Sequence, residues 1–190
     1  MMRDFIIYAN KPLQPGFPLN DLPGSGRADL LARCVNSALW LSHGVRRDTS
    51  VHLSVEVNKQ RLMVTFSGEK MKRVSPDERS IASWIKKALD RFLEGEERVQ
   101  EGITVQKLNL PDFLKRFKGR DIIILKEGGR DIRVTELKEP VFVLGDHLDL
   151  PENLLESLNK FNPKKVSLGP ESLLASHAII LAHGKMDRRN

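Results

Sequence analysis

The sequence predicts one α/β domain, and three observations support this fold class. Two short apolar runs, residues 141–145 and 165–169, each end at a glycine, and a helix-like segment over residues 152–160 separates them. Elsewhere, apolar residues recur at helical spacing in some segments and alternate as in strands in others. The chain also has no internal repeat and no low-complexity linker. This succession of segments is typical of helices packed on a β-sheet.

The first part of the chain predicts a strand, a loop and a helix. Residues 5–8 form an apolar and aromatic run long enough for one buried strand. Residues 10–26 contain four prolines and three glycines, so we expect a functional loop without regular structure. An apolar stripe at helical spacing over residues 30–41 predicts a helix, which Gly44 stops.

The middle of the chain predicts a hairpin and a well-defined helix. Alternating apolar residues at 51–57 and 62–66 flank Asn58 and Lys59, which is typical of a β-hairpin. Residues 75–78 (SPDE) combine a capping box with proline at the first helical position. We expect the helix that follows to end at Gly95.

Short elements follow, ending with a buried strand. Residues 103–105 predict a strand and residues 111–118 a short basic helix. Residues 121–125 (DIIIL) predict a buried strand, closed by a turn at residues 128–129. Residues 132–134 are then expected to pair back as a short hairpin arm.

The C-terminal third carries the strongest indication of a binding site. Ligands in open α/β sheets bind outside the carboxyl ends of strands, and glycine lets a backbone approach a ligand closely. Gly145 and Gly169 stand at such positions, and Pro170 suits the first turn of the following helix. The two glycines predict either a small-molecule pocket or simple turns. The last helix is apolar on nearly all sides, so we expect it to pack against the sheet or a second subunit.

Composition and charge limit the classes of protein. The 190 residues, 40% hydrophobic and 29% charged, are typical of a soluble domain, and no apolar run approaches the roughly 20 residues that cross a bilayer. Residues 1–10 lack the pattern of a secretory signal, and the single cysteine, Cys34, lies in an apolar helical pattern. We therefore expect a cytoplasmic protein with a buried thiol. The net charge of +6 favours a polyanionic partner, although many basic proteins bind no nucleic acid.

Motif patterns exclude several kinds of site. The chain has no phosphate-binding loop, and Gly24 and Gly26 lie in the proline-rich loop instead of after a strand, so they form no dinucleotide fingerprint. The five histidines show no metal-ligand spacing, so no metal site is expected. Cys34 is expected to pack in the core instead of acting as a nucleophile. Asp146 and His147 either move a proton or cap the turn after their strand.

Several stretches of the sequence carry a resemblance to a known family. They are residues 3–5, 19–24 with 26–27, 33–36 with 41–44, 72–79, 145–147 and 167–177. Over almost its whole length the chain closely resembles the archaeal tRNA pseudouridine N1-methyltransferases of the SPOUT class. The resemblance implies a homodimeric α/β protein with a mixed, mainly parallel sheet and a C-terminal trefoil knot. It also implies methylation of N1 of the T-loop pseudouridine at position 54 of tRNA, with S-adenosylmethionine as donor.

The resemblance divides the single domain, residues 1–190, into two parts and leaves alternative functions. An RNA-contacting part covers about residues 1–110, and the knot and cofactor part covers about residues 120–190. A related enzyme could instead methylate a pseudouridine of ribosomal RNA or a ribose 2′-hydroxyl group. The third alternative is a non-catalytic, basic RNA-binding assembly factor. No membrane partner is expected.

Cofactor-binding residues are implied by their positions in the family pattern. They are Leu125, Gly145, Leu168, Gly169, Pro170, Glu171, Ser172, Leu173 and Ala178. A pocket that binds its ligand mostly through the main chain requires glycine and apolar residues, and leaves no charged signature. Family members often carry cysteine at the position of Ala178, so we expect only a packing or main-chain contact there.

The chemistry asks little of acid–base groups, because a sulfonium methyl group is already activated. Alignment of the reacting atoms contributes on the order of 7–11 kcal/mol. A general base contributes about 10²–10⁴-fold in rate, which is roughly 3–5.5 kcal/mol. Positioning therefore outweighs proton transfer. The resemblance makes Asp4 the first candidate for a catalytic contact to the ring nitrogen, and Asp146 is the second.

Basic residues of the N-terminal part are the candidates for the tRNA-binding face. They are Arg27, Arg33, Arg46, Arg47, Lys72 and Arg73. Taken singly, each of them is equally well explained as a solvated surface residue. As a group they predict binding that weakens with salt, by roughly 0.7–0.9 in log K per tenfold salt for each phosphate contacted.

Overall fold

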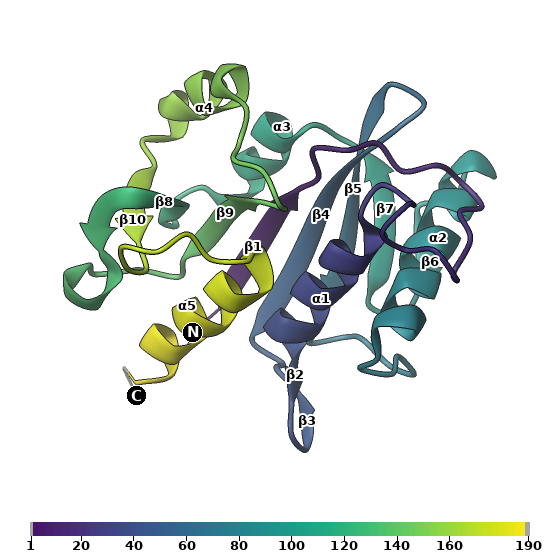
Figure 1. Cartoon of the computed structure of the whole chain (residues 1–190), viewed down its shortest axis with the longest axis horizontal. Helices are drawn as coiled ribbons and strands as arrows, with labels where there is room; N and C mark the ends of the chain where they lie inside the picture. The colour runs from purple at the N-terminus through teal and green to yellow at the C-terminus, as the bar shows by residue number, and fades with distance from the viewer. Residues whose placement is uncertain (1, 189–190) are drawn as a thin grey trace.

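Residues 2–188 are described by the computed structural model, and their centre is a mixed eight-stranded sheet in the order β10-β8-β9-β1-β4-β5-β7-β6 (Figure 1). The half with parallel pairs contains β1 (Arg3–Tyr8), β4 (Thr49–Val57), β8 (Ile122–Asp131), β9 (Val141–Gly145) and β10 (Lys164–Ser167). The antiparallel half adds β5 (Gln60–Ser67), β7 (Ile103–Lys107) and β6 (Arg98–Gln100). The predicted mixed, mainly parallel α/β sheet is confirmed.

Helices cover both faces of the sheet. One face packs against α1 (Ala28–Leu39), α2 (Glu78–Leu93) and α5 (Ala175–Asp187), which lie in front of the strands in Figure 1. The other face packs against α3 (Leu110–Leu114) and α4 (Glu152–Leu158). Successive side chains of a strand point to opposite faces. Phe5 and Ile7 of β1 therefore join the first core, and Ile6 joins the second.

Several locally encoded elements lie where the sequence predicts them. The β4–β5 hairpin turns at Asn58 and Lys59, which both have positive φ, 50° and 61°. Gly95, with φ of 82°, follows the end of α2. The helices α3 and α4 continue as the 3₁₀ turns η1 (Lys115–Phe117) and η3 (Asn159–Phe161). Cys34 is buried in α1, and burial raises the pKa of its thiol to about 12, as expected of a core cysteine.

The starts and ends of two predicted helices are wrong. The first helix ends at Leu39 instead of Leu41, because the chain turns into a short hairpin of β2 (Trp40–Leu41) and β3 (Gly44–Val45). The second helix begins at Glu78, two residues later than predicted. Its N-cap is Asp77, which accepts a hydrogen bond of 2.7 Å from the main-chain N–H of Ser80, in place of Ser75.

The predicted turn at residues 128–129 and hairpin arm at residues 132–134 are also wrong. Strand β8 continues to Asp131, and η2 (Ile132–Val134) is a 3₁₀ turn. The pairing of β8 with β10 jumps from Lys165↔Ile124 to Val166↔Arg130. Residues 125–129 of β8 are therefore left out of this pairing and form an excursion of the strand. A Cβ on Gly129 would lie 2.8 Å from the main chain of Lys165, so glycine permits the close approach of the two strands.

The C-terminal segment also differs from the prediction in one respect. Pro170 does not begin a helix, because residues 168–174 form an irregular loop and α5 begins at Ala175. Between β9 and β10 the chain crosses over β8, since β10 lies beyond β8 in the sheet. The trefoil knot stays a prediction. Within residues 2–188 no helix is both long and apolar enough to cross a bilayer.

Candidate functional site

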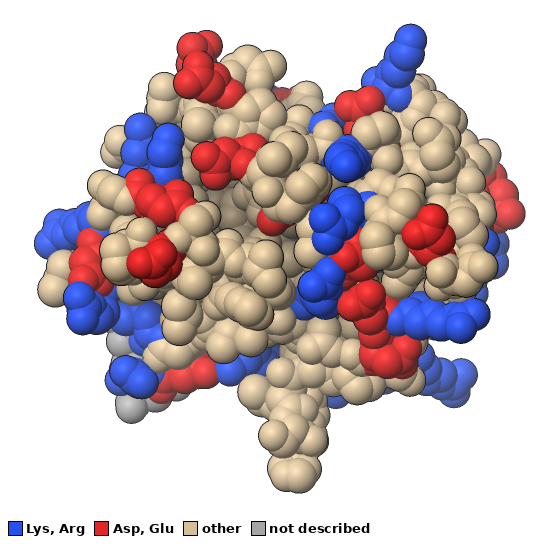
Figure 2. Space-filling view, in the orientation of Figure 1, with Lys and Arg blue, Asp and Glu red and all other residues tan. Residues whose placement is uncertain are grey.

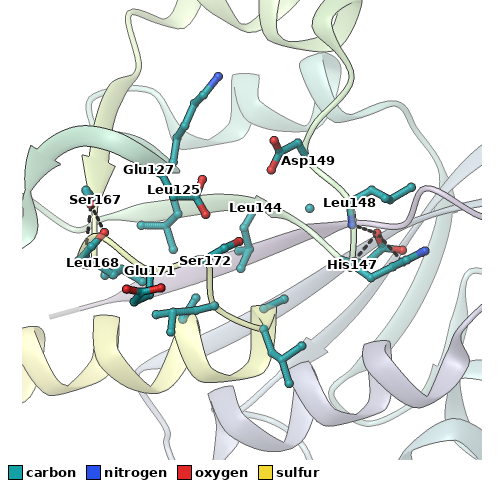
Figure 3. A pocket seen from close by; sticks show the side chains of 18 of the residues that line it. Leu125, Glu127, Leu144, His147, Leu148, Asp149, Ser167, Leu168, Glu171 and Ser172 are labelled. Atoms are coloured by element: carbon teal, nitrogen blue, oxygen red, sulfur yellow. Dashed lines mark hydrogen bonds and ion pairs between the residues drawn. The ribbon is translucent and has the colours of Figure 1, made fainter.

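A pocket of about 300 Å³ lies where β9 and β10 end and where β8 leaves its pairing with β9 after Ile124 (Figure 3). Parallel pairing of these strands brings their carboxyl ends to one edge of the sheet. Three segments form the walls: the β8 excursion at residues 125–127, the turn at residues 144–149, and the loop at residues 166–175. Ala178 of α5 contributes to the lining as well. The glycine-ended strands therefore form a pocket, one of the two alternatives expected from the sequence.

The pocket gathers eight of the nine residues that the family pattern marks as cofactor-binding. These are Leu125, Gly145, Leu168, Gly169, Glu171, Ser172, Leu173 and Ala178. The ninth, Pro170, is exposed and is not among the lining residues. The segments that carry them are up to 53 residues apart in the chain, from Leu125 to Ala178, and the fold brings them together.

The turn after β9 is fixed by a glycine and a buried carboxylate. A Cβ on Gly145 would lie 1.9 Å from the main-chain oxygen of Leu148, so only glycine fits there. The side chain of Asp146 accepts hydrogen bonds from the Asn10 side chain (2.8 Å), the Asn10 main chain (3.1 Å) and the His147 main chain (2.7 Å). Burial alone would raise the pKa of Asp146, but these donors outweigh burial and lower it. Asp146 therefore caps the turn and is a weak base.

The pocket combines apolar walls with acidic and hydroxyl groups. Leu144 and Val166 are buried apolar residues of the lining. Figure 3 shows Glu127 and Asp149 reaching toward the pocket from different loops. Hydrogen bonds to Glu127, first from its own main chain and then from Ser172, lower the pKa of that carboxyl group. Adenosine-like ligands present both an apolar ring system and hydroxyl groups, which such a lining suits.

Asp4, the other catalytic candidate, lies away from the pocket of its own chain. It is opposite Val141 in the β1–β9 register, whereas the pocket lies near Gly145, which is opposite Tyr8. Four residues of a strand span about 13 Å. Asp4 is buried, with one oxygen 2.8 Å from Nε2 of His52 and the other 2.6 Å from Nη2 of Arg120. Burial acts to raise the pKa of Asp4, but His52 and Arg120 lower it overall.

The basic residues of the predicted tRNA face divide into two groups. Arg46 is 15% exposed and pairs with Asp187 at 2.6 Å, and Arg47 donates hydrogen bonds to main-chain oxygens, including that of Gly68. By exposure, Arg47, Lys72 (66%) and Arg73 are exposed, whereas Arg46 is only partly exposed. Arg27 and Arg33 are also partly exposed, 30% and 40%, and both pair with Asp29. Figure 2 shows lysines and arginines in a ridge beside a hollow that is bordered by carboxylates.

Sequence reasoning missed Asn10 and the buried groups around Asp4. The side chain of Asn10 donates a hydrogen bond to Asp146 in the pocket turn, and the two residues are 136 apart in the sequence. The one sequence signal that could have identified Asn10 as a site residue is its place after a strand, at the start of the proline-rich loop. His52 hydrogen-bonds both Asp4 and Oγ1 of Thr65, a contact that no spacing indicates. The described residues include no group of three or more His, Cys, Asp or Glu side chains placed to hold a metal ion.

The fold of the chain is shared with a solved structure. The crystal structure of Archaeoglobus fulgidus Nep1 bound to S-adenosylhomocysteine matches this fold with a TM-score of 0.68. The match covers 99% of this chain and 98% of that chain at 18% identity, so the likeness concerns the fold alone.

Sequence comparison then shows the family. The family model described as "Putative SAM-dependent RNA methyltransferase" matches residues 2–190. Two relatives are each named tRNA (pseudouridine(54)-N(1))-methyltransferase. The relative from Methanosarcina acetivorans is 43% identical, and the alignment covers 98% of this chain and 92% of the relative. The relative from Methanocaldococcus jannaschii is 38% identical, and the alignment covers 99% of this chain and 98% of the relative. The chain belongs to this family of S-adenosylmethionine-dependent RNA methyltransferases.

Proposed function

We propose that the protein methylates N1 of the pseudouridine at position 54 of tRNA, with S-adenosylmethionine as methyl donor. The observation that carries the proposal is the convergence of eight family-pattern residues on one pocket at the strand ends. Relatives that carry this activity in their names align over nearly the whole chain, which supports the same substrate. The reaction is a methyl transfer from sulfur to a ring nitrogen.

The pocket residues fit the methyl donor. A volume of about 300 Å³ lies at the lower end of the range for small-molecule sites. Leu144, Val166 and Ala178 offer apolar contacts to a purine ring, and Glu127 and Asp149 can accept hydrogen bonds from hydroxyl or ammonium groups. When bound, S-adenosylmethionine supplies a methyl group on a positively charged sulfur, which is activated for transfer.

The chain's own contribution is positioning. Gly145 and the Asn10–Asp146 contacts hold one wall of the pocket. Hydrogen bonds between Ser167 and Gly169 hold the loop opposite, with Oγ of Ser167 2.8 Å from the Gly169 main-chain oxygen. A rigid pocket lowers the barrier by aligning the reacting atoms. Asp146 remains ionised because its pKa is lowered, and its buried carboxylate holds the turn instead of taking the proton.

The RNA partner and the assembly belong to the same proposal. Arg27, Arg33, Arg47, Lys72 and Arg73 would contact tRNA phosphates, and Arg46, which is 15% exposed and pairs with Asp187, would support that surface. A homodimer is supported by α5, where Ile180 and Leu181 are 53% and 47% exposed. Exposed apolar residues grouped on one helix are typical of a subunit interface. The protein would act in the cytoplasm.

Methyl transfer to defined tRNA transcripts tests the function. Transcripts with uridine or pseudouridine at position 54 are incubated with S-adenosylmethionine carrying a labelled methyl group. We expect label only in the pseudouridine transcript, and nuclease digestion should locate it in the base. Label in a ribose, or in ribosomal RNA alone, would replace this substrate by another. Absence of S-adenosylmethionine binding in calorimetry would indicate a non-catalytic RNA-binding protein.

A further inference from the structure

A second cavity, of about 370 Å³, lies at the other end of β8, between η1 and η3. Its lining residues are Leu114, Lys115, Phe117, Lys118, Gly119, Arg120, Ile122 and Phe161. Leu114 and Ile122 belong to the second core, so the apolar floor of the cavity is rigid. Three of the lining residues are basic, two are aromatic, and none is acidic. The methyl-donor pocket, in contrast, includes four carboxylates.

The charge around this second cavity is concentrated in a short segment. Residues 107–120 contain five basic side chains, Lys107, Lys115, Arg116, Lys118 and Arg120, and one acidic side chain, Asp112. Arg120 is held in the wall by Asp4 at 2.6 Å and by the main-chain oxygen of Glu139 at 2.7 Å. Lys115 is 65% exposed, and among the described residues it pairs only with Asp112, whose side chain is 42% exposed, so water screens the interaction. Within the described residues Lys118 is exposed and forms no ion pair, so two ammonium groups face solvent at the rim.

We propose that this cavity, the Lys115–Lys118 cavity, is a second RNA-binding site that takes a phosphodiester and its nucleobase. The proposal rests on the proposed function only in naming tRNA as the partner. Lysines at a rim bind phosphates, and aromatic walls stack a base. Phe161 is half-buried. The Nζ atom of Lys160 lies 5.4 Å from the centroid of the Phe161 ring, so a further cation lies beside the stacking surface.

The position of the cavity suits an RNA that already occupies the methylation site. Both cavities are built on the β8–β10 region, one near the strand starts and the other at the strand ends. Arg120 and Leu125 are five residues apart, which in an extended strand is about 17 Å. This separation is shorter than one arm of a tRNA. The cavity lies on the face of the sheet covered by α3 and α4, so it would hold a part of the tRNA that bends round the edge strand β10.

Salt-dependent tRNA binding tests the cavity. The affinity of the full-length protein for a tRNA transcript is measured at several salt concentrations for wild type, Lys115→Gln/Lys118→Gln and Phe161→Leu. The matched control, Lys86→Gln/Lys87→Gln, removes the same charge from α2 near the opposite edge of the sheet. We expect the cavity lysine pair to reduce the slope of log K against log salt by about 1.4–1.8 and to weaken binding about tenfold near 100 mM salt.

The other variants separate the contributions. Phe161→Leu keeps the charge, so we expect roughly fivefold weaker binding at an unchanged slope. Each variant should bind S-adenosylmethionine as wild type does. The proposal would be overturned if Lys115→Gln/Lys118→Gln bound tRNA with the wild-type affinity and salt slope. It would also be overturned if Lys86→Gln/Lys87→Gln lost as much tRNA affinity and salt slope as the cavity variant. If the salt effect appears but wild type transfers no methyl group to tRNA, the proposed function fails while this RNA site stands.

Discussion

Replacing Asp146 with asparagine distinguishes a carboxylate that holds the pocket from one that takes a proton. In the structure both carboxylate oxygens accept N–H donors, one from the Asn10 main chain and the other from the Asn10 side chain and the His147 main chain. An asparagine has the same shape but replaces one of those oxygens with an NH₂ group. In either orientation the NH₂ group of the asparagine would face a main-chain N–H, because Oδ2 of Asp146 faces that of Asn10 and Oδ1 faces that of His147.

The expected cost follows from these contacts. A hydrogen bond to a charged group contributes about 1.5–3 kcal/mol, and an unsatisfied buried donor costs about 1–3 kcal/mol. The side chain of Asp146 is fully buried, so water cannot replace the lost acceptor. We therefore expect the turn to be destabilised by about 3 kcal/mol. If the turn must re-form when S-adenosylmethionine binds, this cost is subtracted from the binding free energy. The affinity for S-adenosylmethionine then falls about 100-fold, since 1.4 kcal/mol corresponds to a tenfold change.

The assay compares donor affinity with turnover at saturating donor. We expect Asp146→Asn to raise the dissociation constant of S-adenosylmethionine in calorimetry, with a smaller loss of turnover. Asp77→Asn is the control, because Asp77 also accepts a main-chain N–H (2.7 Å) but caps α2, away from the pocket. Turnover abolished at unchanged donor affinity would refute this reasoning and make Asp146 a catalytic base.

Three further predictions concern the turn, the core and pH. Gly145→Ala places a Cβ 1.9 Å from the Leu148 oxygen and should weaken donor binding at least tenfold, whereas Gly184→Ala, where a Cβ meets nothing within 4 Å, should not. Asp4→Ala leaves Arg120 unpaired and should lower the free energy of unfolding by about 3–5 kcal/mol in urea titrations; lower turnover at unchanged stability and donor affinity would instead support direct catalysis. Burial, with Arg46 and Arg3, lowers the pKa of His183 from 6.5 to about 4. As the pH falls, His183 therefore takes up a proton in the unfolded chain before it does so in the folded protein. The free energy of unfolding should fall by about 3 kcal/mol between pH 6.5 and pH 4, as measured by urea titrations at each pH. His183→Asn should not show this loss.

Local signals in the sequence were sufficient for several elements. The Asn58–Lys59 turn and the end of α2 before Gly95 depend on residues close in sequence, so composition and spacing predict them. Burial of Cys34 follows from its place in an apolar helical stripe. The start of α2 was misplaced because Ser75 and Asp77 are both good N-caps, and only packing selects between them.

Long-range contacts are the part that spacing does not encode. The Asn10–Asp146 contact joins residues 136 apart, and the excursion of β8 depends on where β10 pairs with it. The sequence pattern at Gly129 predicts a turn, whereas glycine there permits the close approach of a neighbouring strand. Most pocket residues were identified through the family resemblance, since a site that binds through its main chain has no charged motif for a pattern to detect.

The strand order has a consequence for the sequence of folding events. The β4–β5 hairpin pairs residues that are close in sequence, such as Val57 and Gln60. Strand β1, in contrast, pairs with β9, which is distant in sequence, and Asp4 lies opposite Val141. Contacts between distant residues form slowly because a long loop must close first. We expect the antiparallel half to mature early and the methyl-donor pocket to be completed last.

During synthesis, β1 therefore keeps one edge unpaired until more than 140 residues have left the ribosome. S-adenosylmethionine can stabilise only the finished molecule, because incomplete chains lack β9 and β10. The stability of the completed chain should therefore rise with the concentration of methyl donor, whereas that of incomplete chains should not.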